Sequence, residues 1–107
     1  MSDKSETLEE LERRVTEAHV YLGIDQAREE MTQLESRAAS PDLWDNPDEA
    51  RNVTGRLANL RDDIDRWEKV RRELDDTSTL ELLAREEEDE SVDEEIDAAI
   101  SSLEDQL

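Results

Sequence analysis

The sequence predicts an all-α protein, an antiparallel helical bundle of about four to five helices with coiled-coil-like packing. Apolar residues recur in steps of three and four over most of the 107 residues, which is the spacing that places them on one face of a helix. The alternation typical of strands and the Gly-rich turns typical of hairpins do not occur in the sequence. The connections between the apolar runs are short, so consecutive helices are expected to be antiparallel neighbours.

The first two helices are expected before residue 41, with a break at Gly23. Glycine can adopt the left-handed conformation that ends a helix, and Asp25 can cap the helix that follows. Thr7 is expected to cap the first helix, because a glutamate follows it at the third position. The first apolar stripe consists of Leu8, Leu11, Val15, Ala18 and Leu22, and the second of Ile24, Ala27, Met31, Leu34 and Ala38.

Three further helices are expected after residue 46. The third begins after the capping residue Asn46 and is expected to end at the polar stretch Asp75-Asp76-Thr77. A short fourth helix follows from about Ser78 to Glu88, and a fifth begins after Ser91. Ser78 and Ser91 are expected to cap these two helices, because a glutamate follows each at the third position. The third stripe consists of Ala50, Val53, Leu57, Leu60, Ile64, Trp67, Val70 and Leu74, and the last of Val92, Ile96, Ala99, Ile100, Leu103 and Leu107. Together these helices are expected to form one domain, residues 1–107.

Two prolines enclose the segment between the second and third helices. Pro41 disfavours a helical conformation in the residue before it, and Pro47 suits the first helical position, where its missing N–H costs little. Leu43 and Trp44 lie between them. Leaving either side chain exposed instead of buried would cost roughly 2 to 3 kcal/mol. We therefore expect Pro41, Leu43, Trp44 and Pro47 to form a structural plug, with the indole buried over the end of the bundle.

Charge and composition argue against several functions. The formal net charge is −20, and a field this negative repels nucleic acid, whose phosphates are bound by lysine and arginine. Cysteine is absent, which removes disulfides and thiolate metal ligands and fits a reducing cytoplasm. No export signal or apolar run of about 20 residues is present. We expect a cytoplasmic chain with no membrane partner.

Basic residues concentrate on the third helix. Arg51, Arg66, Lys69 and Arg72 lie broadly opposite its apolar stripe, so they are candidates for contact with RNA or a protein partner. The alternative is a solvated face, paired with the acidic residues of the same helix.

No catalytic, metal or cofactor site is expected. His19 is the only histidine, and no second nitrogen or sulfur ligand lies near it in the sequence. A Gly-rich phosphate loop and a spacing that would reveal a nucleophile with its base are also missing.

Three segments resemble the amino-terminal domain of bacterial peptide chain release factor 2. Pro41-Asp42-Leu43-Trp44-Asp45-Asn46-Pro47 resembles that family's Pro-x-hydrophobic-Trp-(Asp/Asn)-x-Pro segment. Tyr21-Leu22-Gly23-Ile24-Asp25 is similar to its Tyr-Leu-x-x-Asp break between the first two helices. Leu80-Glu81-Leu82-Leu83-Ala84, with the acidic stretch after it, is similar to its Leu-x-Leu-Leu-x-Leu-Ala region. The resemblance runs from about Leu8 to the end of the sequence.

The resemblance implies a role in translation termination. The complete factors of this family recognise the stop codons UAA and UGA with a Ser-Pro-Phe tripeptide and trigger peptidyl-tRNA hydrolysis with a Gly-Gly-Gln loop. Neither motif occurs in this sequence, so the chain is expected to be the first domain alone, without direct codon contact. By resemblance, this domain docks on the ribosome near the base of the large-subunit stalk and its ribosomal proteins, and faces the GTPase that recycles release factors.

Two other functions stay open at this point. The chain could be a free-standing antiparallel coiled-coil adaptor, whose apolar stripes pair with a partner. The 33 carboxylates also raise a carboxylate-bridged metal enzyme, although the Glu-x-x-His pairs and the EF-hand loop of such sites are absent.

Overall fold

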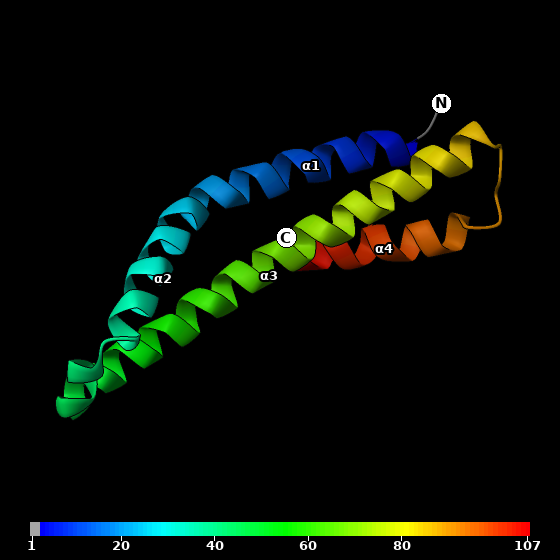
Figure 1. The fold of residues 1–107 in the computed structure, drawn as a ribbon. Helices are drawn as coiled ribbons and strands as arrows, with labels where there is room; N and C mark the ends of the chain where they lie inside the picture. Colours follow the sequence, from blue (N-terminus) through cyan, green and yellow to red (C-terminus); the bar gives the residue numbers. More distant parts are fainter. Residues whose placement is uncertain (1–2) are drawn as a thin grey trace. The chain divides into compact units, whose positions relative to one another are not determined.

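Four α-helices and one short 3-10 helix make up the computed structural model, which describes residues 3–107 (Figure 1). The elements are α1 (Asp3–Tyr21), α2 (Ile24–Ala38), the 3-10 helix η1 (Pro41–Asp45), α3 (Pro47–Glu86) and α4 (Asp93–Gln106). No strand occurs within residues 3–107. The predicted all-α helical bundle is therefore confirmed. None of these helices is both long enough and apolar enough to cross a bilayer.

The chain divides into two compact units, each with its own core. The terminal unit contains the described residues through Ala18 together with Trp67–Leu107, and the hairpin unit contains His19–Arg66. Both units use part of α3, because this helix runs through the boundary between residues 66 and 67.

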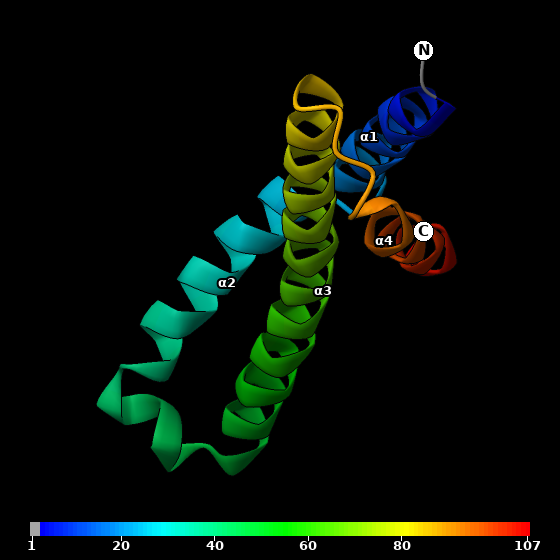
Figure 2. The same ribbon diagram turned by 90° about the vertical axis from the view of Figure 1, so that its right-hand side faces the viewer.

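In the terminal unit, α1, the second half of α3 and α4 lie side by side (Figure 2), and their side chains bury one apolar cluster. The Trp67 Nε1–H donates a hydrogen bond to the Val15 carbonyl oxygen at 3.0 Å, so the half-buried indole also ties α3 to α1. The fully packed members of the cluster come from the predicted stripes and are Leu8, Leu11, Val15, Val70, Leu74, Ile96, Ile100 and Leu103.

In the hairpin unit, α2 and the first half of α3 are antiparallel and are joined through η1 (Figures 1 and 2). Arg56 on α3 binds Glu30 on α2 through two hydrogen bonds of 2.7 and 2.8 Å. The apolar cluster between these helices contains Leu43, Ala50, Val53 and Leu57, with Met31, Leu34 and Ala38 at its margin.

Two of the predicted helix boundaries are confirmed. Gly23 lies between α1 and α2 with φ of 62°, the left-handed conformation that glycine adopts without steric cost. Asn46 caps α3, because its side-chain oxygen accepts a hydrogen bond from the Glu49 N–H at 3.2 Å.

Four of the predicted caps are wrong. Thr7 lies inside α1, which begins at Asp3. The first turn of α1 contains Lys4, whose ammonium lies 3.5 Å from an Asp93 carboxylate oxygen of α4. Ser78 lies inside α3. Asp25 lies within the first turn of α2, after Gly23, and Val92 occupies the position before α4 that was expected for Ser91. Each of these short polar residues fits a cap locally, but the helices begin where packing places them.

The predicted break at residues 75–77 is also wrong, since α3 continues without interruption to Glu86. The buried stripe passes from Leu74 through Thr77 and Glu81, which are polar but only 6% and 7% exposed. Thr77 satisfies its hydroxyl by donating a hydrogen bond to the Glu73 carbonyl oxygen at 2.7 Å. Packing of this face therefore overrides the weak helix propensity of the polar stretch, and the separate fourth helix does not exist.

Glu88 lies two residues beyond the end of α3 in a left-handed conformation, with φ of 53°. The next residue, Asp89, donates its N–H to the Ala84 carbonyl oxygen at 2.8 Å, which closes the helix end.

Substituting Asp76→Pro tests the continuity of α3. Because Asp76 is exposed and lies inside the helix, proline should lower the free energy of unfolding by about 3 kcal/mol or more through the lost hydrogen bond and the ring clash. Urea unfolding followed by circular dichroism measures this change. Asp76→Ala is the matched control and should leave stability unchanged or slightly raised. If the proline variant were as stable as the control, the helix would be interrupted at residues 75–77, and the continuity of α3 would be contradicted.

Candidate functional site

The four basic candidates Arg51, Arg66, Lys69 and Arg72 are all solvent-exposed on α3. Arg51 and Arg66 belong to the hairpin unit, and Lys69 and Arg72 belong to the terminal unit. Arg51 pairs with Asp48 one turn earlier, and the Lys69 ammonium lies 3.8 Å from a Glu73 carboxylate oxygen. Within residues 3–107, Arg66 and Arg72 form no ion pair. Their contact with a partner stays a prediction.

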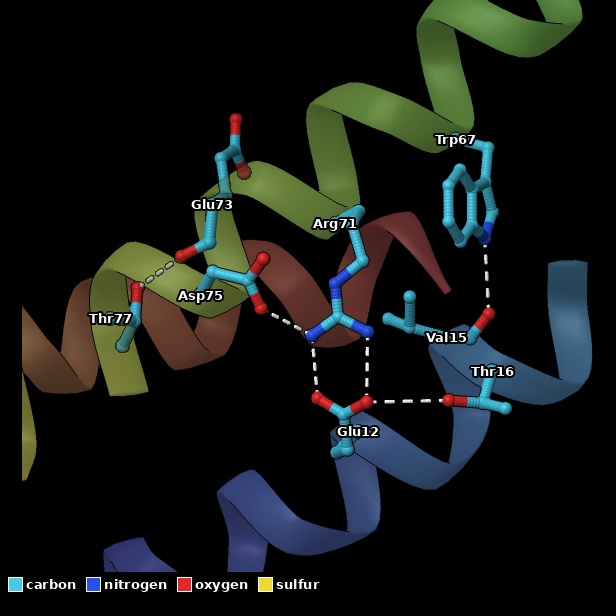
Figure 3. A network of polar contacts seen from close by, with 8 residues as sticks. All are labelled: Glu12, Val15, Thr16, Trp67, Arg71, Glu73, Asp75 and Thr77. Atoms are coloured by element: carbon cyan, nitrogen blue, oxygen red, sulfur yellow. Dashed lines mark hydrogen bonds and ion pairs between the residues drawn. The ribbon is translucent and has the colours of Figure 1, made fainter. Parts of the chain in front are cut away.

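Arg71, which the sequence analysis did not single out, is at the centre of a polar network in the terminal unit (Figure 3). Its guanidinium binds Glu12 of α1 with both Nη atoms, one at 2.8 Å, and also binds Asp75 of its own helix. Thr16 donates its hydroxyl to the same Glu12 carboxylate at 3.3 Å. The Arg71 side chain is mostly buried, and its Nε atom is buried without a partner. This network joins α1 to α3.

The network stabilises the charged forms of Glu12 and Arg71. The hydrogen bonds from Arg71 hold the pKa of the Glu12 carboxyl below its usual range, against the opposing effect of partial burial. The pKa of Arg71 is raised by the same hydrogen bonds. The partner of Arg71 lies 59 positions away in the sequence, so no local pattern could have revealed the pair.

The corner between α2 and α3 places Leu43 and Trp44 in opposite environments. Leu43 is completely buried, in the cluster with Ala50, Val53 and Leu57. Trp44 is 57% exposed, so the predicted burial of the indole is wrong. In a 3-10 helix, successive side chains project about 120° apart, and only one of two adjacent residues can face the core.

The prolines of the predicted plug limit the backbone of the corner, but they add nothing to its core. Pro47 begins α3, as predicted, and Pro41 begins η1, a short helix that the sequence did not predict. Both prolines are exposed. The plug therefore consists of Leu43 alone.

Arg37 closes the same corner from the end of α2. Its Nε and Nη2 atoms donate to the two carboxylate oxygens of Glu49 at 2.9 and 2.7 Å, and its Nη1 lies 3.2 Å from both oxygens of Asp42. These hydrogen bonds lower the pKa of Glu49 and raise that of Arg37. One guanidinium thus joins α2, η1 and α3.

Other large apolar side chains are exposed at the end of α1 and near the end of α3. Leu22 was expected in the first stripe, but it is exposed because α1 ends at Tyr21 and Leu22 lies in the turn before Gly23. Tyr21 is the most exposed of the group. Within residues 3–107, the exposed large apolar residues are Val20, Tyr21, Leu22, Trp44, Leu82 and Leu83.

One hollow of about 280 Å³ lies beside the connection from α3 to α4. Acidic side chains dominate its lining, which includes Glu81, Glu88, Asp89, Glu90 and Asp93, together with Lys4 and Arg85. Among residues 3–107, no group of three or more histidine, aspartate or glutamate side chains has a geometry that could hold a metal ion.

The family model of the PCRF domain matches residues 27–107. The chain belongs to the PCRF domain family. The matched residues of this PCRF domain include nearly all of α2 and the whole of η1, α3 and α4.

Its relatives agree with this family. The chain is 32% identical to peptide chain release factor 2 of Streptomyces avermitilis over 101 residues, which covers 94% of the chain and 27% of that protein. It is 38% identical to the protein of the same name from Acidothermus cellulolyticus over 101 residues, with the same coverage, and 42% identical to that from Frankia casuarinae over 74 residues, or 69% of the chain. The predicted kinship with type 2 release factors is confirmed. The PCRF domain spans about a quarter of the length of these curated relatives.

Two substitutions test the arrangement of the corner. Leu43→Ala should lower the free energy of unfolding by about 2 to 5 kcal/mol, because it leaves a cavity in the packed cluster. Trp44→Ser should change it by less than about 1 kcal/mol, because most of the indole is already in water. Urea unfolding of both variants measures the difference. Equal losses would show that the indole is packed after all.

The Glu12 network predicts a pH-dependent stability. Glu12→Gln removes the charge that Arg71 binds, and should cost about 1 kcal/mol at pH 7, since Glu12 is half exposed and its attraction is screened. Because the pKa of Glu12 is lowered in the folded state, its contribution is complete above about pH 5 and is lost as the pH falls through the folded-state pKa.

Thermal unfolding between pH 3 and pH 7 measures the Glu12 effect. The difference between wild type and Glu12→Gln should shrink below about pH 4. Glu10→Gln is the control, because Glu10 forms an exposed ion pair with Arg13 of its own helix. This substitution should change the free energy of unfolding less than Glu12→Gln does. A difference that grows in acid would contradict the assigned charge state.

Proposed function

We propose that this PCRF domain docks a class I, type 2 peptide chain release factor on the ribosome during translation termination at UAA and UGA codons. The observation that carries the proposal is the family match over residues 27–107, combined with relatives named peptide chain release factor 2 that cover 94% of the chain. The domain acts in the cytoplasm, where ribosomes are found.

The contribution of the domain is binding and orientation rather than catalysis. The motifs that the family uses for codon reading and peptidyl-tRNA hydrolysis, Ser-Pro-Phe and Gly-Gly-Gln, do not occur in the sequence. The best-formed polar constellation, that of Arg71, Glu12 and Asp75, joins α1 to α3 through hydrogen bonds. These features support a domain that positions the remainder of the factor.

The charge of the domain favours a protein surface as its docking partner. The net charge is −20, so bare ribosomal RNA is repelled, whereas basic ribosomal proteins are attracted. We place the docking surface near the base of the large-subunit stalk, where the domain also faces the GTPase that recycles release factors.

Cosedimentation with 70S ribosomes tests the proposal. The PCRF domain should bind with a Kd in about the micromolar range, as expected for a small transient interface. Its affinity should be the same within about twofold whether UAA, UGA or a sense codon lies in the decoding site, because the domain reads no codon. Ribosomes stripped of the stalk-base proteins serve as the control and should bind more weakly.

A codon-dependent affinity would contradict the assigned division of labour between the domains. Absence of binding up to about 100 times the expected Kd would overturn the docking role.

A further inference from the structure

The segment that carries the exposed indole of Trp44 is braced on both sides. Leu43, its neighbour, is completely buried, and prolines restrict the backbone at both ends of the segment. Arg37 binds Asp42, which precedes Trp44 in the sequence, and Glu49, which follows it. The exposure therefore belongs to a well-braced segment, which we call the Trp44 corner (residues 40–49).

An exposed indole in a braced segment is a favourable anchor for a partner. Leaving it in water forfeits roughly 2 to 3 kcal/mol of burial free energy, which a partner can recover without ordering the chain first. Tryptophan is also enriched among the residues that dominate binding energies at interfaces.

The charges around the Trp44 corner indicate what kind of partner fits. Between residues 37 and 51, four carboxylates face two guanidinium groups. Asp45 is exposed and forms no ion pair within residues 3–107, and the Asp48 side chain is 85% exposed. An indole face attracts a lysine or arginine side chain, and the neighbouring carboxylates attract the same groups, while they repel phosphates.

We propose that the Trp44 corner is a docking surface for a basic protein segment, with one lysine or arginine side chain seated on the Trp44 indole and a second paired with the carboxylate of Asp45. The inference rests on the proposed function, since the ribosome supplies the basic protein. It goes further by assigning the contact to the indole and carboxylates of one corner of the hairpin unit, rather than to the basic candidates of α3.

The other exposed apolar residues of the hairpin unit give no such indication. Near Tyr21, the Asp25 carboxylate lies 3.5 Å from the His19 imidazole and 3.9 Å from the Arg28 guanidinium. The charges there oppose one another, so they favour neither a basic nor an acidic partner. This makes Tyr21 a suitable control position.

Binding of three variants to 70S ribosomes tests the inference. Trp44→Ser should weaken binding at least tenfold, although its stability is expected to be near that of wild type. Tyr21→Ser, which removes a more exposed aromatic side chain from the same unit, should bind within twofold of wild type. Asp45→Lys should weaken binding several-fold, because it places a positive charge against a basic partner.

Each result decides a different point. Wild-type binding that Trp44→Ser leaves unchanged overturns the docking surface but not the proposed function. No wild-type binding overturns both. If Asp45→Lys strengthens binding while Trp44→Ser weakens it, the partner at this corner is nucleic acid, and the basic protein segment is excluded.

Discussion

The structure depends on the buried face of α3. This one helix runs for 40 residues and supplies core residues to both units: Val53 and Leu57 in the hairpin unit, and Val70 and Leu74 in the terminal unit. Helices α1 and α4 bury their apolar stripes against its second half, and α2 packs against its first half. A helix this long keeps one face buried only if its sequence maintains the three- and four-residue steps throughout, and here it does so even where the residues are polar.

That continuity explains which parts of the fold could be predicted from sequence. Apolar spacing identified nearly every core residue, because burial of apolar surface is local information repeated along a helix. It failed at Thr77 and Glu81, where polar side chains occupy buried positions of the same stripe. It also failed at Trp44, because hydrophobicity does not say which of two adjacent residues in a 3-10 helix faces inward. The position of Arg71 depends on a tertiary partner, so it could not be read from spacing at all.

The arginines show how the acidic surface arises. Arg37, Arg56 and Arg71 each bind a carboxylate on another helix, so much of the positive charge is used inside the units. The outward-facing charge that a partner meets is therefore dominated by carboxylates. This supports recognition of a basic protein surface and leaves Arg66 and Arg72 as the few cations on α3 that are available to a second contact.

The use of arginine at these junctions also bears on the composition of the chain, in which eleven of the thirteen basic residues are arginine. Arg37 contacts its two carboxylates with three separate nitrogen atoms, and the planar fork of a guanidinium holds those atoms in fixed directions. An ammonium group is a single point of charge and cannot bridge three helical segments in this way. At such positions, lysine would preserve the charge but could not connect the three segments. Geometry rather than charge therefore explains why arginine is used there.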